Sequence, residues 1–292
     1  MGKKKGNDRR KASIEKTIDN LTLFDNALMQ KVFDRNIAAT EYLLRTILKR
    51  KDLKVIEVKG QYDMQSPLIK GRNVTLDILA ETKRGKQINI EVQQDSEGSH
   101  FRRARFHSSM LDSRMLKEGQ KFNELKDSYV IFIYKRDKFR KGLPVYHVTR
   151  YVNEINKEFR DGSNIIYVNG AYEGDNEVGN LLHDFRCKES KDVYNRDLAE
   201  GIRHFKESEE GRKDMRDPLK ELAKEAEERG EKRGEKRGEK RGEKRGEKRG
   251  ESRTRILAIK NIMKNMGCTL EQALDVLEIE GKDRAAIIGK MK

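Results

Sequence analysis

The sequence predicts an α/β domain in which a mixed sheet of four or five strands is flanked by helices. Three observations support this prediction. Two adjacent runs within residues 73–94 alternate in polarity with a period of two, residues 129–134 form a continuous apolar run, and apolar residues elsewhere recur at helical spacing. The continuous run is typical of a strand at the centre of a sheet that is covered on both faces.

The expected elements follow one another through residues 19–208. Residues 19–50 predict two helices, residues 53–58 a strand, and residues 61–72 a loop because they contain Pro and Gly. After the alternating runs, Ser99 can cap a helix that extends towards Leu116. Further strands are expected at 129–134, 145–149 and 165–168, and further helices at 152–159, 178–185 and 193–206.

The alternating runs predict a β-hairpin with Lys83-Arg84-Gly85 as a three-residue loop, in which Gly adopts a positive φ. In a register centred on the middle of this loop, Asp77 faces Glu91 and Thr75 faces Gln93, although a bulge at the Gly could shift the pairing by one residue. The opposite face is apolar and carries Leu76, Ile78, Ala80, Ile88, Ile90 and Val92.

This register places Asp77, Glu91 and Gln93 on one face of the hairpin. Two like charges directly opposite each other disfavour a sheet, so a compensating cation is expected. Mg²⁺ binds through one or two carboxylates together with water and phosphate oxygens. The alternative is that both acids are solvated residues on the polar face of an antiparallel hairpin.

The composition favours polyanionic partners. The 292 residues include 65 Lys and Arg against 50 Asp and Glu, a net charge of +15, which predicts attraction to nucleic acid. Solubility alone would also explain part of this excess, because much of it lies in low-complexity segments. Cys187 and Cys268 lie far apart without ligand-spaced partners, which argues against disulfides and structural zinc. The cysteines suit a cytoplasmic protein, and because no apolar run approaches the roughly 18 residues of a membrane span, no membrane contact is expected.

The two ends of the chain differ from the central domain. Residues 1–18 are expected to form a basic disordered arm. Residues 209–252 contain GEKR repeated five times and predict a charged linker, either a marginal helix or a flexible tether, since each Gly costs a helix about 1 kcal/mol relative to Ala. Residues 253–292 predict a small helical module for homo-oligomerisation or docking, with a capping box at residues 269–272.

Several motifs together resemble a known family. An Asp late in one strand, a short turn and Glu-x-Gln in the next strand resemble the PD-(D/E)XK nuclease superfamily. Motifs across residues 20–208 resemble one branch more closely, the transposase-associated PD-(D/E)XK nucleases, also called recombination-promoting nucleases. These motifs include FDNALMQKVFDRN at 24–36, TEYLLRTIL at 40–48, NIEVQ at 89–93, RARFHSSMLDS at 103–113 and YVIFIY at 129–134.

The resemblance implies a restriction-endonuclease-like fold for residues 19–208 and a Mg²⁺- or Mn²⁺-dependent endonuclease that hydrolyses DNA, associated with recombination or mobile elements. It implies that Asp77 and Glu91 are metal ligands and that Gln93 orients the attacking water. Most of the superfamily has Lys in place of Gln93, and Gln can hydrogen-bond to water but carries no charge. Asp25 and Glu57 are candidates for supporting metal contact, against ordinary roles as a helix N-terminal acid and a polar strand residue.

Four basic residues are candidates for contact with the nucleic acid. Arg102 and Arg105 lie on the helix after the hairpin, and Lys70 and Arg72 lie in the loop before it. His107 could carry a proton, but a lone histidine is more typical of a packing or surface residue. The alternative function is a catalytically inactive basic DNA-binding protein, and an RNA substrate is not distinguished.

Overall fold

A computed structural model describes residues 12–66, 70–93 and 101–291 of the chain. The chain divides into two compact units, one that extends to Glu221 and one that comprises Leu222–Lys292. None of the helices in the described ranges combines the length and apolar character that crossing a membrane requires.

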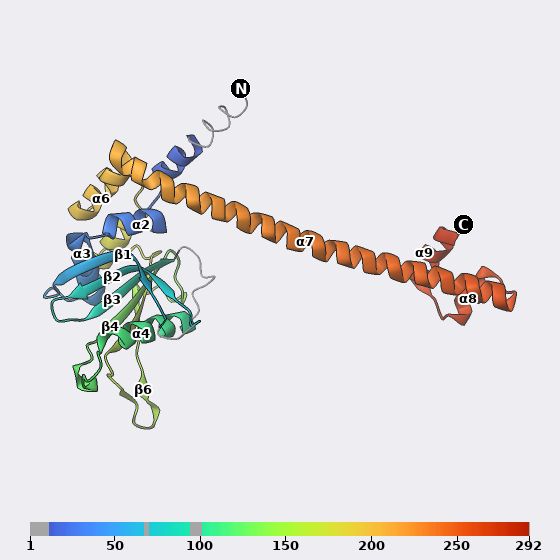
Figure 1. The fold of residues 1–292 in the computed structure, drawn as a ribbon, viewed down its shortest axis with the longest axis horizontal. Helices are drawn as coiled ribbons and strands as arrows, with labels where there is room; N and C mark the ends of the chain where they lie inside the picture. The colour runs from blue at the N-terminus through green and yellow to red at the C-terminus, as the bar shows by residue number, and fades with distance from the viewer. Residues whose placement is uncertain (1–11, 67–69, 94–100, 292) are drawn as a thin grey trace. The chain divides into compact units, whose positions relative to one another are not determined.

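The first unit is built on a six-stranded mixed sheet in the order β1-β2-β3-β4-β8-β5 (Figure 1). The three central strands β3, β4 and β8 are parallel, and the others pair antiparallel. The expected mixed sheet flanked by helices is confirmed, with one strand more than expected, and is consistent with a restriction-endonuclease-like fold. The strands are β1 (Val55–Met64), β2 (Val74–Thr82), β3 (Gln87–Gln93), β4 (Ser128–Tyr134), β5 (Val145–Val148) and β8 (Ser163–Asn169).

Helices cover both faces of the sheet (Figure 1). Strand β4 explains the arrangement, because its side chains alternate between two apolar clusters. Ile131 and Ile133 belong to the larger cluster, whereas Val130 and Phe132 belong to the smaller one. The larger cluster is covered by α2 (Asn26–Phe33), α3 (Ile37–Leu48), α5 (Glu177–Arg186) and α6 (Arg196–Glu207), and the smaller one by α4 (Phe101–Met115).

The hairpin of β2 and β3 has the expected register and loop. Leu79 pairs with Asn89, and no bulge shifts the pairing. Hydrogen bonds from the Thr82 N–H to the Lys86 carbonyl (3.0 Å) and from the Gly85 N–H to the Thr82 carbonyl (2.8 Å) close the loop. Gly85 has a φ of 75°, a conformation that costs other residues about 1–2 kcal/mol.

Leu76 does not lie on the face that strict alternation predicts. It packs with Ala104 and Phe132 in the smaller cluster, whereas Ile78 belongs to the larger one. The pairing of β2 with β3 ends at Ile78 and Ile90. Among the described strands β2 then pairs with β1, whose backbone departs from regular strand geometry at Gln61, which has a φ of 46°.

Two expected elements are wrong in extent or type. Strand β1 continues to Met64, so residues 61–64 belong to a strand and not to a loop. In place of the helix expected at 152–159 there is a small hairpin of β6 (Tyr151–Val152) and β7 (Lys157–Glu158), joined by a 3-10 turn (Asn153–Ile155). Ile155 is 65% exposed, which shows that no core is available to bury a helical apolar stripe here.

Residues 12–18, expected within a disordered arm, are helical instead. The helix covers residues 12–20, and Ile18 is fully buried in the larger cluster. Glu15 also forms ion pairs with Arg212 (2.7 Å) and Arg216 (2.6 Å). Burial and ion pairing therefore hold this segment on the domain. Residues 1–11 of the expected arm, and the expected cap Ser99, lie outside the described residues.

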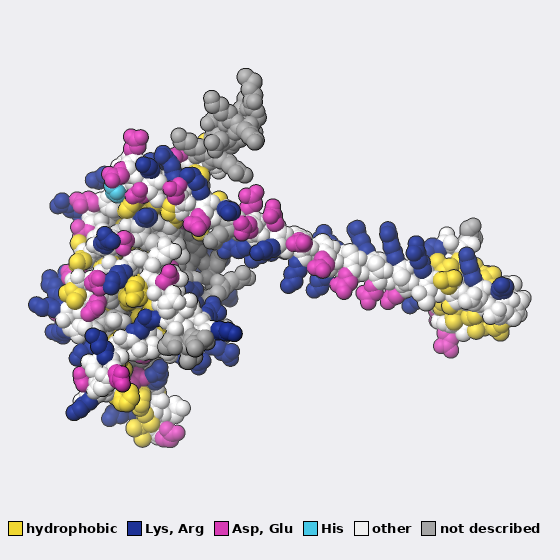
Figure 2. Space-filling view, viewed as in Figure 1, with side chains coloured by type: hydrophobic (Ala, Val, Ile, Leu, Met, Phe, Trp, Pro, Cys, Tyr) yellow, Lys and Arg dark blue, Asp and Glu magenta, His cyan; other side chains and the backbone are white. Residues whose placement is uncertain are grey.

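The GEKR repeats lie within α7 (Glu209–Met266), a helix of 58 residues. Figure 2 shows its acidic and basic side chains gathered on opposite sides, which exchange along the helix. A four-residue repeat advances about 40° per unit around a helix, which explains the exchange. The expected boundary at residue 252 falls inside this helix.

The end of α7 and the two helices after it form a small core in the second unit. Gly267, with a φ of 63°, ends α7, and the expected capping box of Thr269 and Gln272 starts α8 (Leu270–Val276). The core comprises Ile259, Ala273, Leu274 and Ile287, the last from α9 (Gly281–Met291). Homo-oligomerisation through this module stays a prediction.

Replacement of the five repeat glycines by alanine is expected to increase the helicity of the full chain. A Cβ at these positions meets no atom within 4 Å, and Ala favours a helix over Gly by about 1 kcal/mol per residue. Circular dichroism at increasing temperature measures the gain. Gly267→Ala is the control, because its positive φ predicts the opposite sign, and unchanged helicity in the five-fold variant would contradict the prediction. The glycines are Gly230, Gly234, Gly238, Gly242 and Gly246.

Candidate active site

Asp77 and Glu91 come together where β2 and β3 separate. The Asp77 N–H donates to Oε1 of Glu91 (3.3 Å), and the Val92 N–H donates to Oδ2 of Asp77 (3.1 Å). At this point hydrogen bonds from backbone N–H groups to the two carboxylates replace the backbone pairing of β2 with β3. Asp77 is 7% exposed and Glu91 is fully buried, so neither is a solvated residue on a polar face.

The surroundings of this pair oppose negative charge. Burial, and then the neighbouring charge of Asp77, raises the pKa of Glu91 to about 8. Burial also raises the pKa of Asp77, although the hydrogen bond from Val92 opposes this shift. Two buried carboxyl groups with raised pKa values favour the binding of a cation, because a cation stabilises both charged forms at once.

Arg103 supplies a cation to this pair. Its Nη2 lies 2.6 Å from Oε2 of Glu91, and its Nη1 approaches Oε1 of Gln93 at 3.5 Å. The guanidinium carbon lies 5.9 Å from the ring centroid of Phe132. Sequence reasoning selected the neighbouring arginines of α4 and missed Arg103. Its spacing of four residues before His107 was the available signal, because such residues share a helix face.

His107 and Asn89 extend the site into the protein. The Asn89 amide donates to Oε1 of Glu91 (3.2 Å) and lies 3.0 Å from Nδ1 of His107, whose Nε2 is 3.3 Å from Nε of Arg103. A neutral imidazole has one N–H, so its two ring contacts cannot both accept at once. Burial, together with the charges of Arg103 and Arg72, lowers the pKa of His107 to about 4. His107 is therefore neutral near pH 7 and packs against the carboxylate network.

Helix α2 contributes Gln30 to the pair, and not Asp25. Nε2 of Gln30 donates to Oδ1 of Asp77 (3.4 Å). The carboxylate of Asp25 accepts instead from the N–H (2.8 Å) and the hydroxyl (3.0 Å) of Thr22 at the start of the helix. Gln30 has no charge and lies in no catalytic motif that the sequence shows, so the sequence offers no reason to select it as a site residue.

Glu57 also lies away from the carboxylate pair. It is exposed, forms an ion pair with Lys59 (2.9 Å) and pairs across β1 and β2 with Glu81. At about 3.3 Å per strand residue, Glu81 is about 13 Å along β2 from Asp77. The geometry thus gives Glu57 no contact with the proposed ligands.

The four basic candidates are all exposed, and one of them affects the electrostatics of the site. Arg102 and Arg105 are exposed on α4, on the side of the helix away from His107. Lys70 and Arg72 are exposed before β2, and the charge of Arg72 contributes to the lowered pKa of His107. Of these residues, Arg72 therefore has an electrostatic effect inside the site.

The donor atoms at the site fit a hard divalent cation. No group of three or more His, Cys, Asp or Glu residues within the described ranges is placed to hold a metal ion. Asn89, whose amide nitrogen donates to Glu91, also has an Oδ1 that is buried without a hydrogen-bond partner among the described residues. Mg²⁺ prefers an oxygen donor set of this kind and retains several waters.

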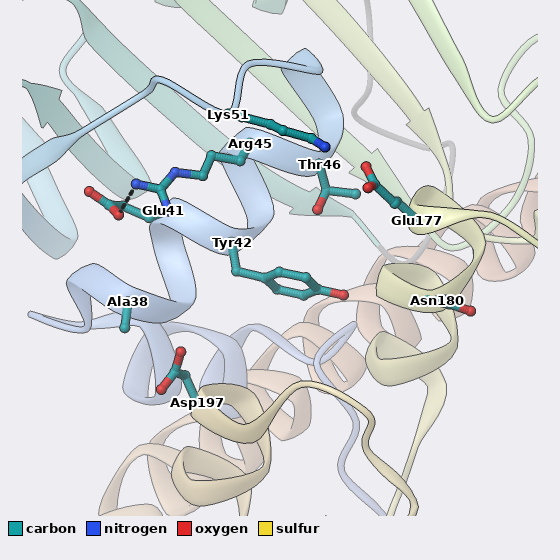
Figure 3. A pocket seen from close by; sticks show the side chains of 9 residues that line it. All are labelled: Ala38, Glu41, Tyr42, Arg45, Thr46, Lys51, Glu177, Asn180 and Asp197. Atoms are coloured by element: carbon teal, nitrogen blue, oxygen red, sulfur yellow. Dashed lines mark ion pairs between the residues drawn. The ribbon is translucent and has the colours of Figure 1, made fainter.

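Two pockets lie elsewhere, between α3 and α5, and share no lining residue with the carboxylate pair. One is about 470 Å³ and the other about 570 Å³. Figure 3 shows the first, in which Glu41 pairs with Arg45 and the Tyr42 side chain points from α3 towards α5. Burial and nearby carboxylates raise the pKa of Tyr42 to about 12, so its phenol stays protonated. Neither pocket joins a nucleophile to a base, and the carboxylate pair remains the candidate centre.

Comparison with known protein families gives a match. Residues 32–171 match the model of a family described as PD-(D/E)XK nuclease family transposase. The matched range includes Asp77, Glu91, Gln93 and the whole of α4, and it excludes Asp25. Neither a curated protein nor a solved structure matches the chain.

Proposed function

We propose that this chain, which matches the PD-(D/E)XK nuclease family transposases over residues 32–171, is a metal-dependent endonuclease that hydrolyses DNA. The observation that carries the proposal is the buried pair of Asp77 and Glu91 where β2 and β3 separate. The family description names both nuclease and transposase, which supports a nuclease associated with mobile elements. The proposal is limited to cutting, because hydrolysis at one site does not by itself join strands.

Each residue of the pair has a defined role in this proposal. Asp77 and Glu91 would hold Mg²⁺ or Mn²⁺, with Oδ1 of Asn89 as a further oxygen close by. A divalent cation supplies two effects when bound, a lower pKa for water and stabilisation of charge on the phosphoryl group. Gln93 can orient the attacking water by a hydrogen bond but adds no positive charge. The water attacks in line with the leaving oxygen, without a covalent protein intermediate.

Basic residues around the site support a nucleic acid as substrate. Arg102, Arg105, Lys70 and Arg72 are all exposed. Figure 2 shows Lys and Arg side chains over much of the visible face of the first unit. Guanidinium groups bind phosphate oxygens through two parallel hydrogen bonds, so these arginines would position the DNA backbone. Two free thiols, Cys187 and Cys268, suit the proposed cytoplasmic location.

Supercoiled plasmid tests the proposal directly. Wild-type protein with Mg²⁺ or Mn²⁺ is expected to produce nicked or linear DNA, and a chelator is expected to prevent this. Asp77→Asn should abolish cleavage, because it removes a charged ligand while its amide oxygen can still accept from Val92. Asp63→Asn is the matched control, since Asp63 is an exposed β1 residue bonded to Thr75. Cleavage by Asp77→Asn at the wild-type rate would refute the assignment.

The absence of a Lys at position 93 favours one alternative, a basic DNA-binding protein without catalysis. Binding by phosphate contacts alone should weaken steeply with salt and should not depend on Mg²⁺. In the same plasmid experiment this alternative predicts retarded but uncut DNA with every variant, with or without metal. An RNA substrate in place of DNA would be recognised by cleavage of a matched RNA only.

A further inference from the structure

Arg103 covers one oxygen of the Glu91 carboxylate. Oε1 of Glu91 already accepts from the Asp77 N–H and the Asn89 amide, whereas Oε2 contacts Nη2 of Arg103 at 2.6 Å. Within the described residues, Arg103 is the one permanently charged side chain paired with either carboxylate. Oε2 is thus the Glu91 oxygen left for a metal ion, and a guanidinium covers it.

The remaining contacts of Arg103 permit its release. The side chain is 34% exposed, so it stands at the mouth of the site with a route to solvent. Its contacts with Gln93 (3.5 Å) and His107 (3.3 Å) are long, and both partners are uncharged. A rotation about side-chain bonds would therefore free the guanidinium without movement of α4.

We propose that Arg103 is a resident counter-cation, which holds the Glu91 carboxylate until a divalent ion displaces it and then binds a DNA phosphate. Two cations cannot share one carboxylate oxygen at close range without strong repulsion in a partly buried site. The displaced guanidinium remains beside the ion, where its planar fork suits two phosphate oxygens. This inference rests on the proposed function, because it assumes that the carboxylates bind a metal.

Metal binding without DNA tests the displacement step. Titration of Mn²⁺ into full-length wild type and Arg103→Gln, by calorimetry at pH 8, should show at least about tenfold tighter binding by the variant, because the competing charge is gone. Arg103→Lys keeps a cation and should stay close to wild type. Arg105→Gln, an exposed arginine on the same helix, is the matched control and should not change Mn²⁺ affinity.

DNA affinity at saturating Mn²⁺ tests the second step. Arg103→Gln is expected to weaken DNA binding by about tenfold while its Mn²⁺ affinity rises. If Arg103 had only a structural role, its replacement would not change DNA affinity and Mn²⁺ affinity in opposite directions. Equal or weaker Mn²⁺ binding by Arg103→Gln, in a wild type that binds Mn²⁺ and cleaves DNA, overturns this inference alone. Failure of every variant to bind Mn²⁺ overturns the proposed function as well.

Discussion

Glu91→Gln is expected to lose metal-dependent cleavage and, in the same protein, to gain stability at alkaline pH without metal. The activity should fall by at least about 10³-fold, because one charged ligand is worth several kcal/mol of transition-state stabilisation. The stability should rise because burial and the charge of Asp77 raise the pKa of Glu91 to about 8, which means that the folded protein disfavours the ionised form. Gln has the same shape without that charge.

The sign of the stability effect depends on pH. Because the pKa of Glu91 is raised on folding, its contribution to the free energy of unfolding is fully present below about pH 4.3 and is lost as pH rises through about 8. Gln does not titrate, so the variant lacks this loss. We expect nearly equal stabilities at pH 4 and an advantage for Glu91→Gln that grows up to about pH 8 and is on the order of 5 kcal/mol at pH 9.

Urea denaturation at both pH values, with chelator present, measures this difference, and the plasmid assay measures the activity. Glu57→Gln serves as control, because Glu57 is exposed and forms an ion pair with Lys59. A Glu91→Gln variant that is less stable than wild type at pH 9 would contradict the electrostatic account. A variant that retains cleavage would contradict the ligand assignment.

The hairpin that carries the site could be predicted from the sequence because local chemistry specifies it. Gly85 permits the positive φ of a three-residue loop, and the loop then determines which residues of β2 and β3 lie opposite. The apolar alternation confirms the same register, since a slip of one residue would expose the whole apolar face. Local turn geometry and the period of two thus agree, and the proximity of Asp77 to Glu91 follows from them.

The contacts around the carboxylates could not be predicted because they depend on where strand pairing ends. Beyond Ile78 the β2–β3 ladder stops, Leu76 turns to the smaller cluster, and the Asp77 side chain bonds to Val92. No local sequence pattern indicates where the pairing of two strands ends. The choice of Arg103 over Arg102 likewise depends on the rotation of α4 against the sheet, which packing of Ala104 and its neighbours determines.

Cleavage at low Mn²⁺ concentration is expected to rise about tenfold per pH unit from pH 6 to pH 7 and to level off above pH 8. Ligands must be deprotonated to bind a metal, and the pKa of Glu91 is raised to about 8. His107 does not add a second step in this range, because its pKa is lowered to about 4 and it stays neutral throughout. The cleavage rate should therefore rise with pH in a single step.

Metal concentration should move this profile in a defined direction. Since Mn²⁺ binds the deprotonated site, a higher concentration pulls the apparent midpoint to lower pH, and at saturation the rise between pH 6 and 8 should nearly vanish. Initial cleavage rates measured across pH at several Mn²⁺ concentrations test both statements. A midpoint that does not move with Mn²⁺ would assign the pH dependence to a group outside the metal site, and the role of Glu91 as a ligand would then fail.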